Sequence, residues 1–121
     1  MTQNGNAENW EAQMRKGCLE MAILASLSDG ALYGLEILRV LERDSQLILS
    51  EGTVYPILNR LRTDGLVVSE WVEAEAGHPR KYYSLTRAGR QRATSMAETW
   101  SVFAGALGRL IQPLLKKQER K

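Results

Sequence analysis

The sequence predicts a mainly α-helical fold with one small β-hairpin and a long C-terminal helix, an α+β architecture. Apolar residues recur at helical spacing in four separate stretches, and the last stripe continues over three heptads. Two segments rich in Val, Trp and Tyr flank a turn that contains Gly77 and Pro79. We expect four regions: a flexible N-terminus at 1–9, a compact domain at 10–85, a C-terminal dimerisation helix at 86–115 and a basic tail at 116–121.

The composition is that of an ordinary soluble globular protein, with 44% hydrophobic and 25% charged residues among 121. A net charge of +2 is too small to indicate nucleic acid by itself, but the cations are unevenly distributed. Five of them crowd into thirteen residues: Arg80, Lys81, Arg87, Arg90 and Arg92. Cys18 is the only cysteine, so an intrachain disulfide is excluded and a reducing cytosol fits. The longest apolar run is five residues, so we expect no membrane span and a cytoplasmic location.

The sequence argues against an enzyme. One histidine and one cysteine cannot supply a conventional zinc site or a Cys–His pair with an orienting third group. No phosphate-binding loop, nucleotide-binding glycine fingerprint or nucleophile elbow occurs. We therefore expect no catalytic residues, no cofactor and no metal.

Two helices are expected before residue 50. The first runs from Trp10 to Leu27 and ends at the Ser28-Asp29-Gly30 turn. The second runs from Leu32 to Asp44, with five apolar side chains facing inward: Leu35, Ile37, Leu38, Val40 and Leu41. Gly34 weakens the first turn of this helix, so we expect a close packing contact there.

A third helix is expected from the N-cap Ser50 to a left-handed residue at Gly65. Val54, Ile57, Leu58 and Leu61 form its apolar stripe. The opposite face carries small, polar, aromatic and cationic residues, with no acid between the first turn and Asp64: Gly52, Thr53, Tyr55, Pro56, Asn59, Arg60 and Arg62. Such a face suits a DNA groove. Pro56 crowds the Gly52 carbonyl, which predicts a strained or 3₁₀-like first turn rather than a break.

A hairpin follows the third helix, with strands at 66–73 and 80–85 around a flexible turn. At least one of Tyr82 and Tyr83 is expected to pack on the core. Three helices followed by a hairpin is the order of a winged helix-turn-helix. In that fold the third helix enters the major groove, and the hairpin tip reaches flanking backbone or minor groove.

The last helix is expected to begin after the N-cap Thr86 and to reach about Gln112, where Pro113 ends or kinks it. Its apolar positions form a heptad seam: Met96, Trp100, Phe103, Leu107, Leu110 and Leu114. A helix of this length spans about 40 Å, more than the compact domain needs. The overhanging stripe predicts packing against a second copy, as a homodimer.

Two blocks of the chain closely resemble the PadR family of bacterial transcriptional regulators. Residues 52–67 match the family's Gly-Thr-Leu-Tyr-Pro helix start, with Val54 in place of the leucine. Residues 77–89 match its Gly-x-Pro-Arg-Lys-Tyr-Tyr-x-Leu-Thr wing, with His78 at the variable position. The Tyr33-Gly34 pair is a third, weaker match. The resemblance covers about residues 14 to 115.

The resemblance implies a homodimeric repressor whose C-terminal helices form the dimer interface. The single C-terminal helix resembles that of the smaller PadR subfamily. Some members of that subfamily bind planar aromatic compounds between the protomers through a tryptophan on the last helix. Trp100 falls where such a residue would lie, so a planar aromatic effector is one expectation for it. The alternative is that Trp100 is plain interface core.

The expected partner is double-stranded DNA at a pseudo-palindromic operator, bound through the helix at 50–64 and the wing at 73–82. Thr53, Tyr55 and Asn59 are expected to contact base edges, while Gly52 and Pro56 permit close approach. The expected phosphate or minor-groove contacts are Tyr33, Arg60, Arg62, His78, Arg80 and Lys81. The rival function is a winged-helix protein-interaction or small-molecule-binding module without specific DNA binding.

Overall fold

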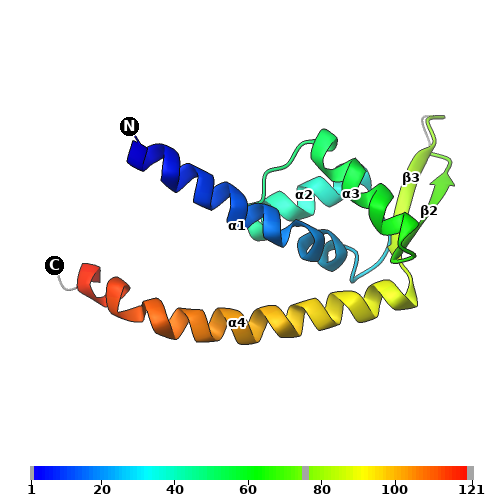
Figure 1. The fold of residues 1–121 in the computed structure, drawn as a ribbon. Coiled ribbons are helices and arrows are strands. Elements are labelled where there is room, and N and C mark those ends of the chain that lie inside the picture. Colours follow the sequence, from blue (N-terminus) through cyan, green and yellow to red (C-terminus); the bar gives the residue numbers. More distant parts are fainter. Residues whose placement is uncertain (1, 75–76, 120–121) are drawn as a thin grey trace.

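A computed structural model of the chain describes the backbone of residues 2–74 and 77–119, and the side chains of 8–74 and 77–116. Its elements follow in the order α1 (Thr2–Ser26), β1 (Leu32–Tyr33), α2 (Gly34–Ser45), α3 (Glu51–Thr63), β2 (Val67–Val72), β3 (Arg80–Leu85) and α4 (Arg87–Glu119). The β2–β3 hairpin lies at one end of the molecule and both termini lie at the other (Figure 1). Helix α4 runs along the whole molecule, and α1 lies between it and the α2–α3 pair (Figure 1).

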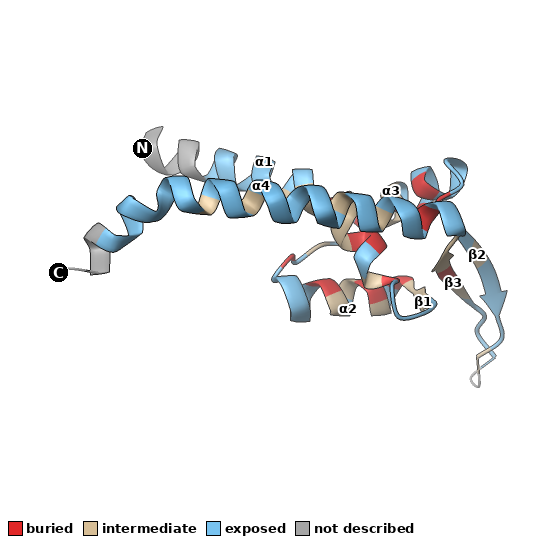
Figure 2. Ribbon diagram, turned by 90° about the horizontal axis from the view of Figure 1, so that it is seen from below, coloured by how far each residue is buried: buried red, intermediate tan, exposed pale blue. Residues whose placement is uncertain are grey.

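The core forms where the first three helices meet the sheet. The buried core residues of these helices are Leu19, Ile23, Leu24, Ile37, Leu41, Val54, Leu58 and Leu61, and Leu27 joins them from the turn after α1. Leu66, Val67 and Tyr83 extend this cluster to the sheet. Burial is concentrated there, whereas most of α4 is exposed (Figure 2). The apolar stripe predicted for α3 is confirmed, although Ile57 is only partly buried.

One inward-facing prediction for α2 is wrong. Leu35 is exposed, whereas Ile37 and Leu41 are buried. Because residues are about 100° apart around a helix, Leu35 lies roughly opposite Ile37. Its early position in the helix places it beside the wing, not in the core.

The sheet has three antiparallel strands in the order β1-β3-β2. Strand β1 was not expected, because two residues are too few to show strand alternation. Tyr33 pairs with Tyr82 and Leu32 pairs with Tyr83. Tyr83 is buried in the core, which confirms that one of the two tyrosines packs inward.

Helix α3 begins and ends as its sequence predicts. The backbone of Ser50 is extended as at an N-cap, although its hydroxyl lies 3.4 Å from the Thr53 hydroxyl and caps no amide. The Thr53 amide donates to the Ser50 carbonyl at 3.0 Å, an i to i−3 bond in the first turn, and the helix runs unbroken through Pro56. Gly65 has φ +78°, the left-handed conformation expected of it.

Two helix boundaries differ from expectation by more than two residues, whereas α2 begins at Gly34, two residues after the expected Leu32. Helix α1 begins at Thr2, eight residues before the expected start at Trp10. Extending a formed helix costs far less than nucleating one, and this stretch contains no proline. Helix α4 continues through Pro113 to Glu119, so residues 116–119 belong to the helix and not to a separate tail. Pro113 removes the bond to the carbonyl of Arg109, a residue that is exposed to water. Residues 120 and 121 lie outside the described part of the chain.

A backbone contact fixes where α4 leaves the sheet. The Thr86 hydroxyl accepts the Gly89 amide at 2.9 Å and donates to the Gly65 carbonyl at 2.7 Å, which confirms Thr86 as the N-cap. A Cβ on Gly89 would clash with the Leu66 carbonyl oxygen. That same oxygen accepts the Thr86 amide at 3.1 Å. The first turn of α4 therefore lies directly against the start of β2.

Gly89→Ala is expected to lower the free energy of unfolding by about 1–3 kcal/mol, because backbone must move to admit the methyl group. Gly17→Ala is the matched control, since a Cβ at this α1 glycine meets nothing within 4 Å. It should raise the free energy of unfolding by about 0.5–1 kcal/mol through helix propensity. Denaturant unfolding measures both variants, and equal stability for the two would contradict the proposed crowding at Gly89.

Candidate nucleic-acid interface

The outer face of α3 is open to solvent. Gly52, Thr53, Pro56 and Asn59 are exposed. At about 100° per residue, Gly52, Pro56 and Asn59 fall within about 60° of one another around the helix. The apolar stripe faces the core on the opposite side. The structure thus presents the predicted face as a convex helical surface with no large side chain at its centre.

Tyr55 lies at the edge of this face instead of standing free on it. A Cβ on Gly34 would clash with the Tyr55 hydroxyl and ring, so the phenol packs directly on the α2 backbone. This confirms the close contact predicted at Gly34. Burial, together with the nearby Glu51 carboxylate, raises the pKa of Tyr55 above its ordinary value of 10.0. The hydroxyl therefore stays protonated at neutral pH and keeps its capacity to donate a hydrogen bond.

A hollow of about 500 Å³, here called the wing hollow, lies between α3 and the hairpin. It brings together predicted residues from three parts of the chain, and its lining includes Tyr33, Tyr55, Asn59, Trp71, Arg80 and Lys81. Glu51 also lines it, so one acid stands among these cations. Residues separated by up to 50 positions in sequence, from Tyr33 to Tyr83, thus share one concave surface beside the exposed face of α3.

Aromatic rings hold the two wing cations in place. The Arg80 guanidinium carbon lies 4.6 Å from the centre of the Tyr33 ring, which in turn packs edge-on against Tyr82 at 5.4 Å. The Lys81 amine lies 5.7 Å from the Trp71 ring and 5.8 Å from the Tyr83 ring. Such cation–π contacts orient a charge without neutralising it. Both cations therefore keep their charge available to phosphate.

Trp71 was missed in the sequence analysis. It is 65% exposed, pairs with Lys81 across the hairpin and shares the wing hollow with Asn59. Directly paired residues of an antiparallel hairpin lie on the same face of the sheet. When the pairing register of the two strands is known, that rule places Trp71 beside Lys81. The register depends on the length of the turn.

The remaining predicted cations are spread more widely. Arg62 is exposed on the wing side of α3, where its charge opposes the rise in the pKa of Tyr83 that burial and Tyr55 produce. His78 is exposed in the hairpin turn, beside residues 75 and 76, which lie outside the described part of the chain. Arg60 does not join the wing hollow. Its guanidinium donates to Glu20 of α1 at 3.1 Å, on the opposite flank of α3.

A second concave surface, the α1–α4 groove, has a volume of about 460 Å³. Its lining is mostly apolar and includes Met14, Cys18, Met21, Met96, Trp100 and Phe103. The Trp100 and Phe103 ring centres are 6.4 Å apart, with the rings tilted by 50°. The groove thus contains the tryptophan that the sequence singled out, together with the first half of the heptad seam.

Most of the heptad seam is exposed to solvent. Met96 packs against the core, whereas Trp100, Phe103, Leu107, Leu110 and Leu114 are all exposed. On α1, Trp10 and Met14 are exposed as well. Large apolar side chains therefore line both long helices beyond the compact core.

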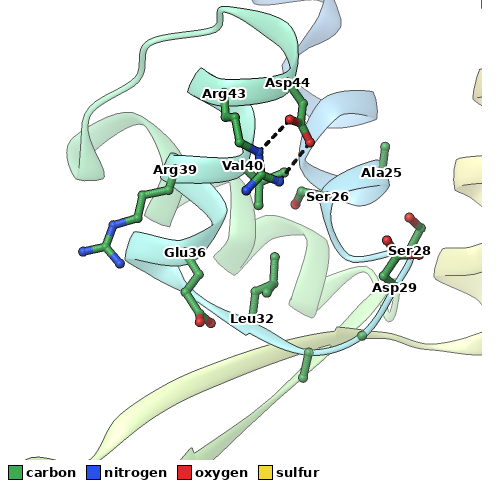
Figure 3. Close-up of a pocket in the computed structure, with 12 residues that line it drawn as sticks. Ala25, Ser26, Ser28, Asp29, Leu32, Glu36, Arg39, Val40, Arg43 and Asp44 are labelled. Atoms are coloured by element: carbon green, nitrogen blue, oxygen red, sulfur yellow. Dashed lines mark hydrogen bonds and ion pairs between the residues drawn. The ribbon is translucent and has the colours of Figure 1, made fainter.

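A third hollow, of about 580 Å³, lies between the end of α1, the turn after it and α2 (Figure 3). Arg43 donates to both carboxylate oxygens of Asp44 there, at 2.7 and 3.1 Å (Figure 3). None of the predicted site residues lines this hollow. Across the described residues, no cluster of three or more His, Cys, Asp and Glu is placed to hold a metal ion. No described helix has the length and apolar character that crossing a membrane requires.

Comparison with known proteins gives a consistent result. Residues 23–95 match the model of the transcriptional regulator PadR-like family. Transcriptional regulator Rv3488 of Mycobacterium tuberculosis is 34% identical over 82 residues, which are 68% of this chain and 75% of that protein. A PadR family regulator of Eggerthella lenta superposes with a TM-score of 0.79 at 29% identity, over 92% of this chain and 96% of that one. A PadR-like regulator of Bacillus cereus gives 0.75 at 31% identity, over 83% and 97%.

Proposed function

Because this chain belongs to the PadR-like family of transcriptional regulators, we propose that it is a homodimeric, ligand-responsive repressor that binds a pseudo-palindromic operator. One observation carries this proposal. The wing hollow joins Asn59 of α3 to Arg80 and Lys81 of the hairpin, beside an outer face that is open to solvent. Asn59, which we assign to base recognition, thus faces the same side of the molecule as the two cations that we assign to the DNA backbone.

The proposed division of labour follows from side-chain chemistry. The Asn59 amide can bond an adenine edge bidentately, and Thr53 offers a methyl group to thymine. Tyr55, whose hydroxyl packs against Gly34, is assigned one hydrogen bond from the margin of the face. Gly52 and Pro56 leave room for close approach. Tyr33, Arg62, His78, Arg80 and Lys81 are assigned to phosphate or the minor groove, where charge supplies affinity without sequence information.

The homodimer is supported by the exposed heptad seam. A stripe of this length resembles the apolar faces that second subunits cover. Two-fold symmetry would hold two copies of α3 at a fixed separation, so each half of the operator would meet one helix. A cytoplasmic location fits a protein that acts on chromosomal DNA.

The test of this function is DNA binding measured by fluorescence anisotropy. The probes are a duplex from the chain's own upstream region and a scrambled duplex of equal length. We expect saturable binding that favours the upstream duplex and weakens steeply as salt rises, because phosphate contacts release counterions. If low salt reveals no preference for the upstream duplex, the apolar groove favours the rival function, a small-molecule or protein-binding module.

The effector proposal concerns the α1–α4 groove. Its volume lies in the range of small-ligand sites, and Trp100 with Phe103 supplies aromatic surface. A planar aromatic compound stacked on Trp100 would quench its fluorescence. We expect Trp100→Ala to remove that quenching and to weaken ligand binding by at least about tenfold, which equilibrium dialysis can measure.

Trp71→Phe is the matched control for this experiment, because Trp71 lies on the hairpin and lines the wing hollow instead of the groove. It should leave the affinity for the aromatic compound unchanged. Undiminished ligand binding by Trp100→Ala would assign Trp100 to interface packing, the alternative role foreseen for it.

A further inference from the structure

A single carboxylate on α1 joins the recognition helix to α4. Glu20 accepts Arg60 of α3 through one oxygen, at 3.1 Å, and Arg92 of α4 through the other, at 3.0 Å. The partners lie 40 and 72 residues away in sequence. The Glu20 side chain is 25% exposed, whereas both arginines are more than half exposed. The carboxylate is therefore the more buried member of this cluster, and the two arginine side chains are the more exposed ones.

Arg60 stands at one margin of the exposed face of α3. Around the helix it lies about 40° from Pro56 and about 100° from Asn59, on the flank that faces α1. An arginine side chain is long enough to turn from this flank onto the outer face. While it donates to Glu20, however, its guanidinium is directed toward α1 and away from the surface that presents Asn59.

We propose that Glu20 is a positioning residue that competes with DNA phosphate for Arg60. The inference rests on the proposed DNA-binding function. Carboxylate and phosphate are both anionic acceptors that a guanidinium binds through paired N–H groups, so Arg60 can serve only one of them fully. Ion pairs at a protein surface are weak, so phosphate can take Arg60 from Glu20 at small cost. Arg92 holds the other carboxylate oxygen, which keeps Glu20 aimed at α3.

Competition from Glu20 lowers the affinity of the protein for DNA below the value that its cations would otherwise give. Each DNA-bound recognition helix must first break one Arg60–Glu20 pair and then leave a carboxylate close to the DNA backbone. Removing the charge of Glu20 should therefore strengthen DNA binding, whereas loss of an ordinary structural ion pair should leave binding unchanged or weaken it. The sign of the effect separates the two roles.

The test uses Glu20→Gln in the full chain, with the upstream and scrambled duplexes as probes. We expect binding to both duplexes to tighten by about two- to fivefold per recognition helix, the range that a surface ion pair allows. The slope of log affinity against log salt should steepen by about one per helix, because Arg60 becomes a full phosphate contact. Glu20→Ala, which leaves no acceptor at all, should tighten binding at least as much.

Glu11→Gln is the matched control. Glu11 lies on the same helix, makes the same kind of ion pair with Arg15 at 3.2 Å, and its replacement changes the net charge equally. It should leave affinity and salt slope at the wild-type values. Compared with Arg60→Gln alone, the double variant Glu20→Gln, Arg60→Gln should show no gain in DNA affinity. Circular dichroism melting of each variant verifies that it is folded.

Two outcomes would overturn the inference: affinity of Glu20→Gln equal to that of Glu11→Gln, or a gain that persists when Arg60 is absent. Both are distinct from failure of the proposed function. In that case the wild-type chain itself would show no preference for the upstream duplex.

Discussion

Leu110→Glu is expected to dissociate the proposed dimer and to weaken operator binding by more than about 100-fold, because two linked recognition helices gain that much from acting together. Leu110 is 75% exposed on α4 and lies in the heptad seam, outside the core cluster. The folded protomer therefore tolerates a charge there. A dimer seam does not, since an unpaired carboxylate would be buried against apolar side chains.

Light scattering after size exclusion measures the first effect. The wild-type chain should elute at twice its mass of 13.6 kDa, and the variant at 13.6 kDa. Ile48→Glu is the matched control, because Ile48 is 77% exposed but lies in the connector between α2 and α3. It should remain dimeric. A dimeric Leu110→Glu variant with unchanged operator affinity would place the dimer contact elsewhere.

The parts of the fold that the sequence predicted are those with local signals. Helix α3 has a start residue, an apolar stripe and a left-handed glycine within sixteen residues, and the structure reproduces all three. Thr86 was identified as an N-cap for the same reason, because capping involves neighbours in sequence. The returning strand at 80–85 also matches its predicted bounds.

The features that were missed depend on distant residues. Strand β1 is extended only because it pairs with β3, fifty positions later. The contact of Tyr55 with Gly34 explains why a glycine occupies the first turn of α2. The residues near Gly34 in sequence do not indicate that Tyr55 is the side chain that packs there. In the sequence, Arg60 does not differ from other exposed cations. Only the fold brings it within hydrogen-bond distance of Glu20. Helical periodicity gives the flank on which a side chain stands, but not the group that it meets.

The two helix ends that differed from expectation have a related cause. Polar composition suggested an irregular start, and Pro113 suggested an end or a kink, but both are penalties of limited size. Helix α1 extends outward from Leu19 and Ile23, which the core already fixes. The free energy that holds these helices comes from packing that is remote from their ends, so composition at the ends is a weak guide.

Asn59→Ala is expected to weaken binding to the cognate duplex by about 1–3 kcal/mol, or about 5- to 150-fold, and to relax preference at one base pair. Asn59 is exposed on the outer face of α3, outside the core cluster. Its loss should therefore leave the fold intact. The defect should arise because a base edge that the amide satisfied is left without its partner.

Comparison with Arg62→Ala separates base recognition from phosphate binding. Arg62 lies three residues further along α3, so both variants shorten an exposed side chain of the same helix. As a phosphate contact, Arg62 should contribute to every duplex alike, and its loss should reduce the salt slope by about one per helix. Asn59→Ala should leave the salt slope unchanged and affect mainly the cognate duplex.

If Asn59→Ala instead weakens binding to the cognate and scrambled duplexes equally, Asn59 contributes to affinity alone and the base sequence is recognised by other residues. Trp71 and Tyr55, which share the wing hollow with Asn59, would then be the next residues to test.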